Sequence, residues 1–165
     1  MNVGALACGF ALLVAGCGGE EAARDVALAE RDSSFAALQE RGEVGMGVDQ
    51  YASAHRFDIL DDGGLIELQY DSDDAAEIDR IRTHMQQIAA AFQAGDFETP
   101  EFVHAADVPG VDVLKARREH VTYTYRSLPR GGEVRITTAD PAALEAIRHF
   151  MHFQRSDHRD GGHGH

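Results

Sequence analysis

The sequence predicts an α+β domain in which two strand–strand–helix units form one four-stranded antiparallel sheet with two helices on one face. Three observations support this. Two stretches alternate apolar and polar residues on either side of a glycine-containing turn, and each is followed by apolar residues at helical spacing. In addition, the two halves resemble each other: Gly63-Gly64 corresponds to Gly131-Gly132, and Ile81-Arg82-x-x-Met85 corresponds to Ile147-Arg148-x-x-Met151.

The first unit begins with a predicted hairpin. One strand carries His55, Phe57 and Ile59 on a single face, because residues two apart point the same way. Asp61-Asp62-Gly63-Gly64 predicts the turn, and the return strand places its apolar residues on one face as well. These residues are Ile66, Leu68 and Tyr70.

A helix follows this hairpin. Asp74 with Glu77 has the pattern of a capping box, and Gly95 is placed as a C-terminal stop. Between them, apolar residues recur every three or four positions, as a helix with one buried face requires. They are Ile78, Ile81, Met85, Ile88 and Phe92.

Residues 96–119 form a long connection that contains Pro100 and Pro109-Gly110, and Asp112 is expected to cap a short helix ending at Arg118. Next comes the second hairpin, with its turn at residues 129–132. Asp140-Pro141 then predicts a helix start, with a capping side chain followed by proline in the first turn. The apolar positions of this unit are Val121, Tyr123, Tyr125, Val134, Ile136, Leu144, Ile147 and Met151, with Gln154 continuing the helical stripe.

The N-terminus has the pattern of an export signal. An apolar run from Ala5 ends at Val14-Ala15-Gly16-Cys17, and it is shorter than the roughly 20 residues that a membrane-spanning helix needs. Val14-Ala15-Gly16-Cys17 resembles the bacterial lipobox, in which the cysteine is lipidated and becomes the first mature residue. Residues 1–6 carry no Lys or Arg, so either the start lies upstream or the signal is weak. A buried apolar helix is the alternative interpretation.

This pattern divides the chain into four parts. Residues 1–16 are the expected signal peptide, and residues 17–34 are the lipidated cysteine and a tether that is partly helical. Gly42, Gly45 and Gly47 are expected to interrupt any helix that continues beyond it. Residues 35–158 form the single domain, and residues 159–165 are expected to be a disordered tail rich in histidine and glycine.

Charge and cysteine content limit the function. The chain has 28 Asp and Glu against 15 Lys and Arg, which argues against nucleic-acid binding because that needs a basic surface. It also disfavours docking of the protein body on anionic lipids, so the lipid on Cys17 is the expected membrane contact. Cys8 and Cys17 are the two cysteines. The mature domain then has no thiol for disulfides, metal ligation or catalysis.

The histidines are the candidate functional residues. His55 shares the strand face of Phe57, His84 lies beside the apolar helix stripe, and His104 lies in the long connection. His158 continues the stripe of the last helix. A buried imidazole needs a partner, because an unpaired buried polar group costs about 1–3 kcal/mol. By contrast, His149 and His152 are expected to face solvent, and His163 and His165 belong to the tail.

Convergence of His55, His84 and His104 would form a site for Zn²⁺ or Cu²⁺ with an open position. Asp49 and Tyr51 precede His55 and would stand beside it as ligand-binding or supporting groups. Ser53, His55 and Asp49 have the residue types of a nucleophilic triad, but nothing marks Ser53 as activated. Four separately satisfied histidines are the alternative.

A family resemblance rests on several motifs within residues 35–160. Met46-Gly47-Val48-Asp49-Gln50-Tyr51 and Phe102-Val103-His104 are two of them, and Phe150-x-x-Phe153-Gln154-x-x-Asp157-His158 is a third. With these, the chain resembles a family of small exported bacterial proteins without an established function. Some members carry the label aspartate carbamoyltransferase, an enzyme with a Ser-Thr-Arg-Thr loop that is missing from this sequence. The resemblance implies a single exported domain and no mechanism.

Three function classes remain open. The first is a cell-envelope lipoprotein that faces the periplasm and binds a small ligand or a transition metal through inward-facing histidines; the outer membrane is favoured over the inner. The second is a lipoprotein with a non-catalytic role in protein interaction or structure. The third is a small hydrolase or lyase that uses histidine as an acid–base group.

The lipobox generates the first testable prediction. We expect the mature protein to begin at a lipidated Cys17 and to partition into detergent with the membrane fraction. Cys17→Ser should leave an unlipidated form of precursor size, because the thioether to the lipid cannot form. Intact mass spectrometry of protein from the native host measures this directly, and an unmodified Met1 in that sample would contradict the prediction.

Overall fold

A computed structural model describes residues 18–158. The predicted signal peptide, Cys17 and the tail at residues 159–165 lie outside this range. The elements follow one another along the chain as α1 (Gly18–Met46), β1 (Ser53–Leu60), β2 (Gly63–Tyr70), α2 (Ala75–Ala94), α3 (Glu98–His104), α4 (Val111–Ala116), the 3₁₀ turn η1 (Arg118–His120), β3 (Val121–Leu128), β4 (Gly131–Thr138) and α5 (Pro141–Asp157).

The chain divides into two compact units between Ser33 and Ser34. In the first unit, residues 18–33 belong to α1, and the side chains of residues 23–33 are exposed. The second unit holds the rest of α1 and all other elements. The predicted interruption at Gly42 and Gly45 is wrong, since α1 continues through both glycines. This part of the helix packs on the domain and buries Leu38.

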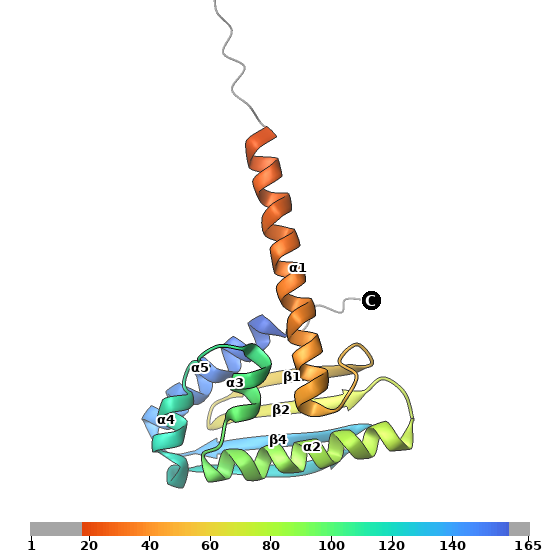
Figure 1. The fold of residues 1–165 in the computed structure, drawn as a ribbon. Helices are drawn as coiled ribbons and strands as arrows, with labels where there is room; N and C mark the ends of the chain where they lie inside the picture. Colours follow the sequence, from red (N-terminus) through yellow and green to blue (C-terminus); the bar gives the residue numbers. More distant parts are fainter. Residues whose placement is uncertain (1–17, 159–165) are drawn as a thin grey trace, which may run out of the picture. The chain divides into compact units, whose positions relative to one another are not determined.

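The predicted α+β fold is confirmed. The four strands form one antiparallel sheet in the order β1-β2-β4-β3, so the two hairpins lie side by side with β2 and β4 at the centre (Figure 1). The central register pairs Ile66 with Val134, and the core lies on the side of the sheet that α2 and α5 cover. Of the predicted core helix residues, Ile81, Met85, Ile88, Ile147 and Met151 are buried. Leu144 is only partly buried, and Ala143 and Phe150 join this face instead.

The helices are crossed with respect to the hairpins that precede them. Helix α2 follows the first hairpin but packs chiefly against β4 and β3, whereas α5 packs chiefly against β1 and β2 (Figure 1). The guanidinium of Arg82 donates to the carbonyl oxygens of Leu128 (2.9 Å) and Gly131 (3.3 Å), which ties α2 to the second hairpin. The corresponding Arg148 pairs with Glu145 on its own helix.

The glycine pairs that the sequence comparison aligned allow this crossing. A Cβ on Gly64 would lie 3.1 Å from Cε of Met151, and a Cβ on Gly132 would lie 3.3 Å from Cβ of Met85. Each methionine therefore lies over a glycine of the other unit. A side chain at either glycine would crowd the helix above it. Since each helix packs on the hairpin of the other strand–strand–helix half, the two halves depend on each other for their packing.

The helix ends follow the predicted caps, and the connections differ in detail. Asp74 accepts hydrogen bonds from the amides of residues 76 and 77, and Asp140 from those of residues 142 and 143. Gly95 ends α2 with φ 82°, as predicted. The first hairpin turn is tighter than expected, because Leu60 already pairs with Gly63. In the long connection, Asp112 lies inside the first turn of α4 after Gly110, so it is not the cap.

The opposite face of the sheet carries a row of charges across all four strands. Arg56 pairs with Glu67, Glu67 lies opposite Glu133, and Glu133 pairs with Arg126. Arg126 forms an ion pair with Glu133, and Arg56 lies 3.9 Å from Glu67. The two arginines thus offset the repulsion between two glutamates that face each other on central strands.

The core generates a stability prediction. Ile81 and Ile147 are fully buried under the crossed helices. Ile81→Ala or Ile147→Ala should lower the free energy of unfolding by about 2–5 kcal/mol, through lost burial and the cavity left behind. Chemical denaturation measures this, with Val26→Ala on the exposed part of α1 as a control that should change little. An effect of Ile147→Ala as small as that of the control would show that the helix phase is wrong.

Candidate functional site

One cavity of about 60 Å³, partly open to solvent, lies between the sheet and the helices. Its walls are mainly apolar and include Phe57, Ile88 and Phe150, and no Asp or Glu of the described residues lines it. Four histidines from four different parts of the fold also line it. They are His55 of β1, His84 of α2, His104 of α3 and His158 at the end of α5.

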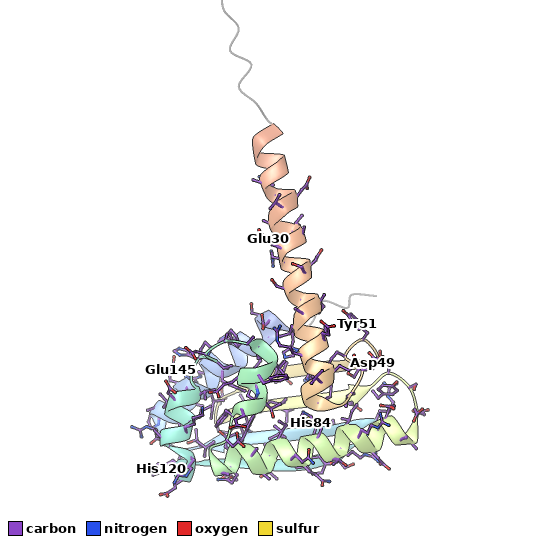
Figure 2. All side chains as sticks on the ribbon, viewed as in Figure 1. Glu30, Asp49, Tyr51, His84, His120 and Glu145 are labelled. Carbon is purple, nitrogen blue, oxygen red and sulfur yellow. The ribbon has the colours of Figure 1, made fainter. Side chains whose placement is uncertain are left out.

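The structure places the three predicted histidines around this one cavity and adds His158 to them. Asp49 and Tyr51, which were expected beside His55, do not line it. Both lie on the loop after α1, whereas His84 lies on α2 (Figure 2). The reason is local: the Asp49 carboxylate accepts from the Tyr51 amide at 2.8 Å and so shapes the loop, and the Tyr51 side chain is exposed. The Ser53 hydroxyl donates to the Asp49 carbonyl oxygen at 2.8 Å, so that bond does not support a triad with His55.

His104 is held at both ring nitrogens. Its Nδ1 is bonded to the Asp157 carboxylate, and its Nε2 lies 2.8 Å from Oε1 of the buried Gln154. The ring also meets Phe153 edge-on at a centroid distance of 4.9 Å. These contacts join the end of α3 to the last turns of α5. They come from two motifs of the family resemblance, Phe102-Val103-His104 and Phe153-Gln154-x-x-Asp157-His158, so the motif residues meet in space.

The rings of His55, Phe57 and His158 pack against one another beside β1. His55 stacks on Phe57 with ring centroids 5.7 Å apart and on His158 with centroids 4.7 Å apart. His158 in turn meets His104 edge-on at 5.0 Å. Strand alternation explains the inward direction of His55, as predicted. His158 faces the cavity because positions 147, 151, 154 and 158 lie on one face of the helix.

Burial keeps these imidazoles neutral. Burial, together with the smaller effects of nearby His84 and His104, lowers the pKa of His55 to about 3. Burial alone lowers the pKa of His84 to about 4. The pKa of His158 also lies well below its usual value, through burial and the neighbouring His55 and His104, although Asp157 acts in the opposite direction. At neutral pH these three rings are therefore uncharged, and each offers one donor and one acceptor.

The expected zinc or copper centre of His55, His84 and His104 finds no support in the geometry. Across residues 18–158, no three side chains of His, Cys, Asp or Glu are grouped so that they could hold an ion together. His104 cannot serve as a ligand, because its two ring nitrogens are already engaged by Asp157 and Gln154. The exposed His149 and His152 lie on the outer side of α5, as predicted.

A second, open hollow adjoins the first. It is lined by residues of α2 and the end of α1, among them Asp79, Thr83 and Gln87. Met46 and His84 line both hollows. In the part of the chain that the structure describes, no helix is both long and apolar enough to cross a bilayer.

Comparison with protein-family profiles, curated proteins and solved structures gave no match for this chain.

The lowered pKa values generate a prediction about acid stability. Between pH 6.5 and about 4, the unfolded chain binds protons at His55, His84 and His158 that the folded chain does not, so stability falls as the pH falls through this range. His55→Phe should reduce the loss of unfolding free energy between pH 7 and pH 5 by about 2 kcal/mol. Urea unfolding at both pH values measures this. His149→Phe, on the exposed face of α5, is the control, and equal acid sensitivity of His55→Phe and the parent would contradict the prediction.

Proposed function

We propose that this protein is a lipid-anchored protein of the cell envelope whose domain binds a small guest in the histidine-lined cavity. The anchor is Cys17 on the periplasmic side of the membrane, with the outer membrane favoured over the inner because Gly18 rather than Asp follows the cysteine. The acidic body stays clear of anionic lipid, and α1 joins the anchor to the domain.

One observation carries the binding proposal. Within residues 18–158, the ring nitrogens of His55, His84 and His158 have no hydrogen-bond partner, although all three rings line the cavity. They are also not among the fully enclosed polar atoms without partners, which are Oε1 of Gln50 and the hydroxyl of Tyr123. Neutral, unpaired imidazole nitrogens that can be reached from an apolar cavity are suited to contact a guest.

The other two function classes have less support. A purely structural lipoprotein would gain nothing from neutral imidazoles, because apolar side chains of similar size would pack in the same place without the desolvation cost. A hydrolase would need an activated nucleophile within reach of one of these rings. In the described part of the chain, the Ser53 hydroxyl instead donates to a backbone oxygen.

Phenol is a suitable probe of the cavity, because it combines an apolar ring with one hydrogen-bond donor. We expect it to shift the ring-nitrogen NMR resonances of His55, His84 and His158 in the full chain carrying Cys8→Ser and Cys17→Ser. Thr99→Phe should abolish the shifts, because Thr99 lines the cavity and the larger ring would fill it.

Thr122→Phe, at an exposed position of β3, is the matched control and should leave the shifts unchanged. Benzene, which lacks the donor, should bind more weakly than phenol. If phenol leaves the three histidines unperturbed, or if both phenylalanine variants behave like the parent, the cavity is not a binding site.

A further inference from the structure

We propose that the guest of the cavity is a cuprous ion, held by imidazoles and methionine thioethers; this rests on the binding function proposed above. The observation behind it is the full donor set of the cavity. Besides its histidines, the cavity is lined by the thioether side chains of Met46, the last residue of α1, and Met85 of α2.

The chemistry of these donors selects for a soft metal ion. Thioethers are soft ligands that favour Cu(I), whereas carboxylates and carbonyls favour hard ions such as Mg²⁺ and Ca²⁺. Among residues 18–158, neither Asp nor Glu lines this cavity. The donors of these described residues are therefore uncharged: imidazole nitrogen, thioether sulfur, the Thr99 hydroxyl and the Gln154 amide, whose oxygen is already bonded to His104.

The apolar walls of the cavity also favour an ion of low charge. The energy needed to transfer an ion into an apolar cavity rises with the square of its charge, so a neutral donor set compensates a monovalent ion far better than a divalent one. Zn²⁺ would also require about four ligands in a tetrahedral arrangement. The absence, in residues 18–158, of any three-ligand group of His, Cys, Asp and Glu disfavours it further.

Geometry indicates which imidazoles take part. His104 has both nitrogens engaged, so it supports its neighbours and does not ligate. His55 and His158 have unpaired nitrogens, but their rings stack with centroids 4.7 Å apart, so their in-plane lone pairs run side by side and only one of the two ligates the ion. Met46 and Met85 supply the sulfur atoms. Met46 also lines the neighbouring open hollow, where a turn of its flexible side chain would admit the ion.

The test is anaerobic titration of the full chain with Cu(I) in competition with bicinchoninate. The chain carries Cys8→Ser and Cys17→Ser, so that no thiol competes, and His163→Ala and His165→Ala, so that the tail does not contribute. We expect a single Cu(I) to be retained. Met46→Leu with Met85→Leu should weaken retention by more than about tenfold, since loss of even a group that only orients a metal ligand costs about 10- to 100-fold.

Met151→Leu is the matched control, because Met151 is a buried methionine that does not line the cavity. Leucine keeps most of the volume of methionine, so the variants should fold, and thermal unfolding without metal checks this. Each single methionine variant is measured as well, so that one unfolded variant does not remove the test. X-ray absorption of the copper-loaded chain should show sulfur bound to copper, and the double variant should lose this signal.

Three results would overturn the inference. They are failure to retain Cu(I) against the chelator, equal retention by the double methionine variant and the parent, and retention of Zn²⁺ more tightly than Cu(I). If phenol still perturbs the cavity histidines under any of these results, the binding function stands and only the cuprous ion is excluded. If phenol has no effect either, both proposals fall together.

Discussion

The hydrogen bonds of His104 hold the candidate site together. The ring joins α3, which belongs to the long connection, to Gln154 and Asp157 at the end of α5. Without this link, the connection would lose its side-chain hydrogen bonds to the end of α5. With it, α3 closes one side of the cavity and holds Phe153 and His158 near β1. The Nε of Arg41 reinforces the arrangement from α1 by donating to the Val103 carbonyl oxygen at 2.7 Å.

Burying the three imidazoles without hydrogen-bond partners lowers the stability of the fold. His55, His84 and His158 are buried enough to lose their charge, yet their nitrogens remain unpaired in the described part of the chain. Apolar residues in the same places would be more stable, because they carry no desolvation penalty. Sites that violate the rules of a satisfied core are commonly functional, since the missing interaction is then available to a ligand. The rest of the core, with its crossed helices and buried isoleucines, can offset this cost.

The crossed packing explains how a small domain supports an open cavity. Because α2 covers the second hairpin and α5 the first, each unit needs the other to bury its apolar face. Gly64 and Gly132 let Met151 and Met85 approach the sheet closely at the crossing points. Met85 therefore has two environments, since it packs above Gly132 and also lines the cavity. The same packing that stabilises the domain thus brings one of the proposed sulfur donors to the site.

Local pattern in the sequence determined the strands, the two long helices, their caps at Asp74 and Asp140, and the inward direction of His55. These features follow from alternation, helical spacing and capping chemistry, all of which act within a few residues. Only the tertiary structure decided that Asp49 and Tyr51 lie outside the cavity, that His158 lines it, and that His104 is held by Gln154 and Asp157. The physical reason for the His104 contacts is that they join residues fifty or more positions apart, whereas Asp49 and Tyr51 are held in their loop by a local hydrogen bond. Which helix covers which hairpin depends on the packing of whole side-chain surfaces, and no local spacing encodes it.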